Sequence, residues 1–482
     1  MSTPQLPEEL KRALQALIVR FLPFADAATK ELPLPRLLRL SLFQVSVGMA
    51  IVLLNGTLNR VMVVELGMPV WLVSLMIALP LVFAPLRALI GFNSDYHRSA
   101  FGLRRLPYIW WGTLAQFGGF AFMPFALLLL SDPDNPLRFV GHLAGALAFL
   151  LVGAGLHTAQ TAGLALATDI APEESRPRVV ALLYVTLLLG MVGSALTFGY
   201  LLTNFSPLKL VQVIQGVAAA TILINITALW RQEAVDPQRA AAKIVRPSFR
   251  ETWREFVEDR FAGRLLVVVG LGTAAFSMQD ILLEPYGGQV LGLSVSQTTV
   301  LTAIWAFGTL VAFGLSGMLL SRGWDSTRIA ATGVVLGLLA FAAVIVAGVS
   351  GAAWLFRGGT LLIGFGGGLF AVCTLIAAMR LAEGGHSGLA LGAWGAVQAT
   401  ANGGAILFGG SLRDAVEFLG EHGHLVRVGI DMPGPAFAYG VVYFLEIVLL
   451  VATLVAIVPL LLAKHRALVQ ASDKKFGISE ML

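Results

Sequence analysis

Ionisable and amide side chains that interrupt long apolar runs are the residues of this chain best suited to chemistry. One group lies in the first apolar run, at Asn55, Asn59 and Arg60, and a second lies in the seventh, at Asp280 and Glu284. A charged side chain at the centre of a bilayer costs roughly 2.5 to 3.5 kcal/mol on insertion scales, so such residues usually serve a function. We expect Arg60 to pair with Asp280 or Glu284 as a gate or ligand clamp. A pair that only pins two helices together is the alternative.

Two histidines offer a different chemistry. His142 and His157 lie about four turns apart in the fourth apolar run, and a neutral imidazole is a common metal ligand. An imidazole at membrane depth could ligate the magnesium of a chlorin, although a lone histidine in a helix is more often only hydrogen-bonded. His422 and His424, with Glu417 and Glu421, could be drawn as a periplasmic metal site, but the geometry of a third ligand is not clear. No protease, P-loop, nucleophile-elbow or dinucleotide motif occurs in a credible context, so the sequence gives no support for an enzyme.

A basic stretch between the second and third apolar runs is predicted to lock helix ends together. A glycine, an acid four residues later and arginines around a second glycine suit a tight turn whose carboxylate accepts guanidinium hydrogen bonds. This stretch resembles the loop between the second and third helices of major facilitator superfamily transporters. The predicted network combines it with two other loops and comprises Arg87, Gly91, Asp95, Arg98, Arg104, Arg105, Asp169, Glu173, Arg176, Arg322 and Arg380.

Membrane-spanning helices must position these residues. With 57% hydrophobic residues, 13% charged residues and a mean hydropathy of +0.81, the chain has too little polar surface for a soluble globule. The apolar runs are about 20 to 28 residues long, which suits a hydrocarbon core of about 30 Å. We therefore predict an all-α integral membrane protein with twelve transmembrane helices. They are expected near residues 40–64, 70–92, 107–130, 139–167, 179–203, 209–230, 263–286, 296–320, 328–350, 353–378, 388–411 and 437–462.

The distribution of charge predicts the orientation of the chain. With both termini in the cytoplasm, about 26 Lys and Arg fall on that side against about 5 outside. The net charge of +5 follows from this bias and from contact with anionic lipid, so it does not indicate nucleic-acid binding. Glu8 and Glu9 argue against a secretory signal, and the apolar spacing around them suits either a helix on the membrane surface or a soluble cap.

An internal repeat divides the chain into two halves. A shift of 225 residues aligns the sequence LGMPV at 66–70 with LGLSV at 291–295, and it matches Asn55 and Asn59 with Asp280 and Glu284. Two six-helix halves around a cavity near the midplane are the architecture that such repeats imply, which is the major facilitator fold. We expect a cytoplasmic or interfacial N-terminal segment (1–36), a six-helix half (37–230), an amphipathic cytoplasmic linker (231–262), a second six-helix half (263–463) and a cytoplasmic tail (464–482).

Several segments resemble the PucC/LhaA family, a branch of the major facilitator superfamily. They are residues 21–29, 37–49, 56–62, 88–95, 160–169 and 177–184, and the resemblance extends along essentially the whole chain. It implies an assembly factor for light-harvesting complexes in the intracytoplasmic photosynthetic inner membrane of purple bacteria. The implied cofactor is bacteriochlorophyll, with carotenoid as a second candidate. The implied partners are antenna polypeptides, the reaction-centre complex and bacteriochlorophyll-synthesis enzymes.

Three functional hypotheses follow. The first is a membrane chaperone that shields a tetrapyrrole and docks antenna helices. The second is a proton-coupled secondary transporter in which Asp280 and Glu284 titrate. The third is a structural scaffold of the photosynthetic membrane that binds antenna protein without pigment. The small number of charges near the midplane favours the first, since a polar solute normally needs several convergent hydrogen-bonding groups.

Overall fold

The computed structural model describes residues 32–82, 103, 105–132, 134–172, 175–233, 260–381, 387–422 and 434–475. Within these residues the regular secondary structure is helical throughout, and ten helices are long and apolar enough to cross a membrane. The other two predicted spans correspond to the shorter apolar helix α3 (Val70–Val82) and to α16 (Ser387–Glu421). The prediction of an all-α, multi-span membrane protein is therefore confirmed.

Contacts divide the chain at places that differ from the predicted halves. Unit 1 comprises Met1–Leu54 and Pro85–Lys243, and unit 2 comprises Asn55–Ala84 and Ile244–Leu482. The segment Asn55–Ala84 belongs to the first half of the sequence repeat, but it packs with helices of the second half. Hydrogen bonds and close helix contacts described below explain this assignment.

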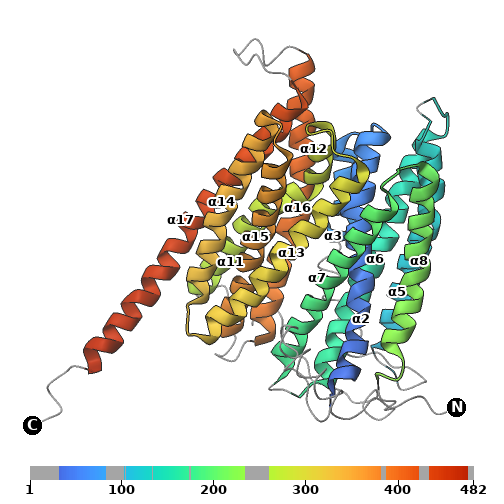
Figure 1. Cartoon of the computed structure of the whole chain (residues 1–482). Helices are drawn as coiled ribbons and strands as arrows, with labels where there is room; N and C mark the ends of the chain where they lie inside the picture. Colours follow the sequence, from blue (N-terminus) through green and yellow to red (C-terminus); the bar gives the residue numbers. More distant parts are fainter. Residues whose placement is uncertain are drawn as a thin grey trace, which may run out of the picture. The chain divides into compact units, whose positions relative to one another are not determined.

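Unit 1 is a bundle of five helices in the described residues (Figure 1): α2 (Leu34–Ile51), α5 (Leu106–Leu130), α6 (Arg138–Ile170), α7 (Arg176–Leu201) and α8 (Pro207–Leu229). The most extensive helix pair in this unit is α5 with α6. Gly112 and Gly155 face each other across it, and a Cβ atom on either would lie 2.6 Å from the carbonyl oxygen of the other. Small residues allow this approach, which supplies van der Waals packing where lipid removes the hydrophobic driving force.

A chain of polar side chains ties three helices of unit 1 together. Ser46 Oγ of α2 donates to Asn225 Oδ1 of α8 at 2.8 Å, and Asn225 Nδ2 donates to Thr113 Oγ1 of α5 at 2.8 Å. All three side chains are buried. Interhelical hydrogen bonds of this kind specify which helices associate within a membrane.

Unit 2 contains the remaining elements (Figure 1). The boundary falls within the first of them, so that residues 52–54 belong to unit 1. Its elements are η2 (Val52–Leu58), η3 (Val61–Glu65), α3, α11 (Arg260–Ser277), η5 (Met278–Ile281), α12 (Leu283–Gln289), α13 (Val295–Ser321), α14 (Ser326–Ser350), α15 (Ala353–Leu381), α16 and α17 (Pro435–Lys475). The most extensive pair is α14 with α15, where Gly333 approaches Gly366. This pair holds the same place in the repeat as α5 with α6.

Candidate functional site

Two of the predicted spans are irregular at matching places in the repeat. The seventh span breaks between α11 and α12, where residues Met278–Ile281 form a single 3-10 turn. The first span leaves regular α-helix at Val52–Leu58 and again at Val61–Glu65, which are π-helical. A shift of 225 residues superimposes the break on the first π-helical segment. Such irregularities are frequent at functional sites, because they free backbone groups and turn side chains inward.

The two acids predicted from the sequence lie at this break. Asp280 is half-buried on the 3-10 turn and accepts a hydrogen bond from the amide of Gln279. Glu284 of α12 is only 5% exposed and accepts a hydrogen bond from Thr302 Oγ1 of α13 at 2.8 Å. A Cβ atom at Gly56 would lie 2.7 Å from the same Thr302 oxygen, so the glycine leaves the room that this contact needs.

The two asparagines of the first span have different surroundings. Asn59 is fully buried, and its Nδ2 donates to the carbonyl oxygen of Ile281 at 2.9 Å. This bond satisfies a carbonyl that has no helical donor four residues later, because that residue is Pro285 and proline has no N–H. Asn55 is half-buried in the π-helical segment. The neighbouring hydroxyls of Thr57 and Thr299 lie 3.2 Å apart and tie this segment to α13.

Arg60 pairs with an acid that the sequence analysis did not consider. Its Nη1 donates to the carboxylate of Glu65, and its Nη2 donates to the carbonyl oxygen of Leu293 at 3.2 Å. The predicted pairing of Arg60 with Asp280 or Glu284 is therefore wrong. The physical reason is the π-helical turn: residues five apart lie near each other in this geometry, whereas they diverge on a regular α-helix.

A double-mutant cycle tests this pair. We expect Arg60→Met and Glu65→Gln each to destabilise the purified protein, and the double variant to lose less than the sum of the two. The expected coupling is about 0.5–3 kcal/mol, measured by unfolding in detergent, because contacting residues are not additive. A parallel cycle with Glu284→Gln is the control. A larger coupling of Arg60 to Glu284 than to Glu65 would restore the original prediction.

One buried carboxyl group and one buried phenol of α17 were not predicted from the sequence. Glu446 and Tyr443 are fully buried in the middle of an otherwise apolar span. The Tyr443 ring lies 5.3 Å from that of Tyr286, centroid to centroid. A single glutamate within the predicted span 437–462 was the available signal, because an ionisable group at that depth is costly.

Arg413 is the centre of a second missed cluster, just past the predicted end of its span. It is 4% exposed, and its guanidinium donates to Asp414 at 2.8 Å, to both oxygens of Glu417 and to Gln289 Oε1 at 3.0 Å. The guanidinium carbon lies 4.7 Å from the centre of the Tyr439 ring, and the Tyr439 hydroxyl donates to Gln289 at 2.8 Å. The cluster therefore joins α12, α16 and α17.

The backbone of α3 is tied to the same cluster. The amide nitrogen of Trp71 donates to Asp414 Oδ2 at 2.7 Å. Further along α3, the Oγ atom of Ser74 would lie 1.8 Å from a Cβ atom at Gly410, which shows how closely α3 approaches α16. These contacts account for the assignment of this segment to unit 2.

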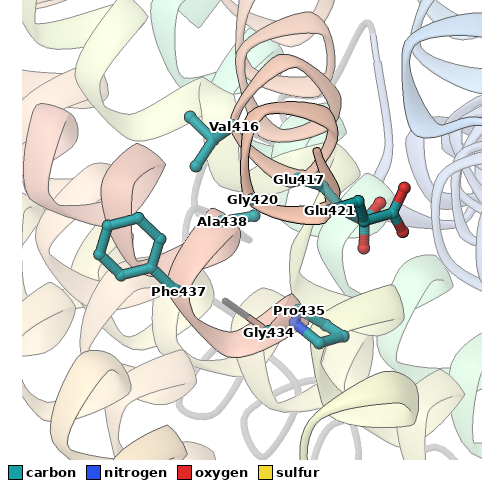
Figure 2. A pocket seen from close by; sticks show the side chains of 8 residues that line it. All are labelled: Val416, Glu417, Gly420, Glu421, Gly434, Pro435, Phe437 and Ala438. Atoms are coloured by element: carbon teal, nitrogen blue, oxygen red, sulfur yellow. The ribbon is translucent and has the colours of Figure 1, made fainter. Parts of the chain in front are cut away.

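Two hollows border the Arg413 cluster. One of about 230 Å³ lies between the end of α16 and the start of α17, and Figure 2 shows Glu417 and Glu421 projecting from α16 with Pro435 and Phe437 on α17. The second, of about 630 Å³, is lined from α3, α12 and α16 and includes Trp71, Gln289, Arg413 and Phe418. The Arg413 guanidinium already donates to the carboxylates of Asp414 and Glu417. It is therefore not available to bind an anion in either hollow. The described residues contain no group of His, Cys, Asp and Glu able to hold a metal ion.

The histidines proposed as ligands both lie in α6. His142 is half-buried near the start of this helix, and His157 is half-buried about four turns later. His142 makes no hydrogen bond with the described residues. Its neighbours Phe139 and Leu143 are 70% and 56% exposed on the same helix.

The predicted loop network is only partly within the described residues. Arg105 Nε donates to Asp169 Oδ2 at 3.0 Å, so the structure brings these two members together. Glu233, from the predicted linker, accepts the backbone N–H groups of Arg105 and Leu106 at the start of α5, where a carboxylate complements the helix dipole. Arg322 caps the end of α13 and is exposed. The side chains outside the described residues are those of Arg87, Gly91, Asp95, Arg98, Arg104, Glu173, Arg176 and Arg380.

Comparison with known proteins gives one family and a consistent set of relatives. Residues 57–465 match the family model described as PUCC protein. The chain is 57% identical to Protein PucC of Rhodovulum sulfidophilum, over 82% of this chain and 89% of that protein. It is 51% identical to an uncharacterized protein in the puhA-bchM intergenic region of Rhodobacter capsulatus, over 93% of this chain and 94% of that protein. It is 29% identical to the bacteriochlorophyll synthase 44.5 kDa chain of Rhodobacter capsulatus, over 79% of this chain and 87% of that protein.

Solved structures confirm the fold. A bacterial homologue of the human lysosomal transporter Spinster, in its inward-facing and unoccupied conformation, has a TM-score of 0.62 at 16% identity, over 88% of this chain and 95% of that one. The nucleoside transporter NupG has a TM-score of 0.60 at 13% identity, over 88% of this chain and 98% of that one. Both are transporters of the major facilitator type, so the predicted fold class is confirmed. At these identities the likeness concerns the fold alone.

Proposed function

Because this chain belongs to the PucC family, we propose that it is an assembly factor that handles bacteriochlorophyll and brings it to antenna polypeptides. Its site of action is the intracytoplasmic photosynthetic membrane of a purple bacterium, with both termini in the cytoplasm as the charge distribution predicts. Carotenoid is a second candidate cargo, and the reaction-centre complex and pigment-synthesis enzymes are candidate partners.

The observation that carries this proposal is the agreement among the relatives. A relative whose name places it between puhA and bchM and a relative named as a bacteriochlorophyll synthase chain both align along most of this sequence. The sequence itself carries no catalytic motif in a credible context, which favours pigment handling over pigment synthesis. The first and seventh predicted spans carry few ionisable groups near the midplane, which suits a hydrophobic tetrapyrrole better than a polar solute.

His142 is our candidate ligand for the magnesium of the pigment. Its imidazole is half-buried in α6, and it makes no hydrogen bond with the described residues. The exposed side chains of Phe139 and Leu143 provide apolar surface beside it for a flat macrocycle. A neutral imidazole with a free nitrogen lone pair is a suitable axial ligand. His157, in the same helix, is the second candidate.

Replacing His142 by leucine tests this assignment. We expect the protein purified gently from a pigment-producing strain to carry bacteriochlorophyll, and the His142→Leu variant to carry at least several-fold less per polypeptide. The measurement is near-infrared absorption together with a pigment extract. His422→Leu is the matched control, because His422 is exposed at the end of α16. Equal pigment in the wild type and in His142→Leu would remove His142 from the site.

A deletion strain tests the function itself. Loss of the gene is expected to reduce assembled antenna complexes and to leave the photosynthetic membrane with antenna polypeptides that lack pigment. Normal antenna polypeptides with normal pigment would contradict the proposal. A purified protein that carries antenna polypeptides but no pigment would support the scaffold hypothesis instead.

Proton-coupled transport is the second candidate function. The observation that favours it is the position of the acids Asp280 and Glu284 at a helix break. Uptake of a small solute by vesicles containing the purified protein, driven by a pH gradient, is the result that would select it.

A further inference from the structure

Glu446 is the most unusual buried group of the described residues. It lies in the apolar part of α17 (Pro435–Leu462) with 0% of its surface exposed. Neither of its carboxylate oxygens makes a hydrogen bond of normal geometry, and the donor that faces it is the backbone N–H of Gln279. The hydroxyl of Tyr443, one turn earlier, is also buried without a partner. Both side chains lie within unit 2, where α17 packs against α11, α14 and the 3-10 turn η5.

The acids at the helix break act on this group electrostatically. The charge of Asp280 on η5 disfavours ionisation of Glu446, and the charge of Glu284 on α12 disfavours ionisation of Tyr443. The side-chain oxygen of Gln279, on the same turn, is buried and has no donor. The region therefore gathers acceptor oxygens from η5, α12 and α17. Asp280 and Glu284 each accept a hydrogen bond, from Gln279 and Thr302, whereas Glu446 is left without one of normal geometry.

The other titratable and charged groups that face the cluster do not neutralise it. Tyr286 of α12 donates its hydroxyl to the carbonyl oxygen of Val344 on α14, and Tyr439 donates to Gln289. Arg60 is engaged by Glu65. Arg413 is engaged by Asp414 and Glu417. The described parts of α11, α14 and α16 place no further cation against Glu446.

An ionised carboxylate is very costly at such a position. Without a cation or a well-aligned donor, it loses its hydration and gains little in exchange. A neighbouring carboxylate adds repulsion in a region of low dielectric. A metal ion would relieve both costs, but the described residues do not form a ligand set for one. The ligand that fits is a proton, which converts Glu446 into a hydrogen-bond donor for a nearby oxygen.

We propose that Glu446, together with Asp280 and Glu284, forms a proton-binding site inside unit 2, and that proton uptake there controls the helix break at η5. The link to the break is direct, because Asp280 lies on η5 and Asn59 donates to the carbonyl oxygen of Ile281 on the same turn. A change of charge at these acids therefore alters the joint between α11 and α12 and the π-helical segment that contacts it. This inference does not depend on the cargo of the protein.

Infrared spectroscopy of the full-length protein in lipid nanodiscs tests the site. The wild type is expected to show the carbonyl stretch of a protonated carboxyl group at neutral pH, and this band is expected to be lost in Glu446→Gln. Glutamine reproduces the shape and neutrality of the protonated acid, so the variant should fold. Glu421→Gln, at an exposed acid of α16, is the control and should keep the band. An unchanged band in Glu446→Gln would overturn the proposal.

The pH dependence of unfolding provides a second test that needs no band assignment. A proton held in the folded state and released on unfolding makes the unfolding equilibrium constant rise about tenfold per pH unit. This rise begins above the pH at which the carboxyl ionises in the unfolded chain and ends where it ionises in the folded one. The wild type is expected to show this rise. In Glu446→Gln the slope of the logarithm of the unfolding constant against pH is expected to be smaller by about one, because one proton fewer is released. A slope that depends on sodium and not on pH would overturn the proposal in favour of a cation.

The pigment content of Glu446→Gln separates this inference from the proposed function. A variant that loses the band and keeps bacteriochlorophyll supports a proton site independent of pigment binding. The infrared result decides the proton site whatever the pigment content, and the deletion strain decides the proposed function.

Discussion

Replacing Arg413 by methionine is expected to destabilise the protein by about 3–5 kcal/mol, because removing one partner of a buried ion cluster leaves the others uncompensated. Arg413 is 4% exposed and holds Asp414, Glu417 and Gln289 together. Methionine keeps most of the apolar stem of arginine. The loss of stability therefore measures the contribution of the guanidinium more than that of side-chain packing. The measurement is reversible unfolding in detergent, followed by near-ultraviolet circular dichroism.

Two matched variants control this experiment. Arg322→Met removes an exposed arginine at the end of α13 and is expected to change stability by no more than about 0.5 kcal/mol. The double variant Arg413→Met with Glu417→Gln is expected to recover part of the loss, since it removes an unpaired, half-buried charge. A single variant as stable as Arg322→Met would show that the cluster does not stabilise the fold.

Introducing one methyl group at Gly364 is expected to be the second large effect. A Cβ atom there would lie 2.0 Å from the carbonyl oxygen of Trp305 on α13, so α13 and α15 must separate to admit it. Overpacking of this kind costs about 1–3 kcal/mol or more. The separation also disrupts the bond from Thr309 Oγ1 to the Gly364 carbonyl, which measures 3.0 Å. We expect Gly364→Ala to lower the yield of folded protein and its unfolding temperature.

The same helix offers the control for this prediction. Gly358 of α15 has open space where its Cβ atom would be, so Gly358→Ala relieves the poor helix propensity of glycine without a clash. The expected change is a gain of up to about 1 kcal/mol. Opposite signs at the two positions would show that helix contact, and not propensity, determines the effect. Equal effects would contradict the close contact of α13 with α15.

Hydropathy predicted the spans well because each span combines the contributions of about 20 residues, and errors at single positions average out. The start of α5 at Leu106 and the start of α13 at Val295 each lie within one residue of the predicted positions 107 and 296. The repeat was equally informative, since a shift of 225 residues relates the helix irregularities at η2 and η5. The division into units was not predictable in this way, because the contacts of the segment Asn55–Ala84 are made with residues more than 200 positions later.

The candidate site was predicted less completely. The cost of burying charge in lipid identified Asp280, Glu284 and Arg60 from the sequence. It did not reveal that Arg60 faces Glu65, since this depends on a π-helical turn that periodicity alone does not show. Arg413 lies two residues past the predicted span end, where an arginine is normally expected to reach water. Only the packing of α12 and α17 over it makes Arg413 a buried residue.

The sequence by itself determined that this chain is a helical membrane protein of two related halves, belonging to the PucC family. Those conclusions rest on local composition and on the order of segments along the chain. Neither depends on how the helices are arranged. The tertiary structure alone decided which distant polar groups meet: Asn59 with Ile281, Arg413 with Gln289, and Glu446 with the turn that carries Asp280. In a medium of low dielectric the free energy of a polar group depends mainly on its few nearest neighbours, and helix packing brings those neighbours from distant parts of the sequence.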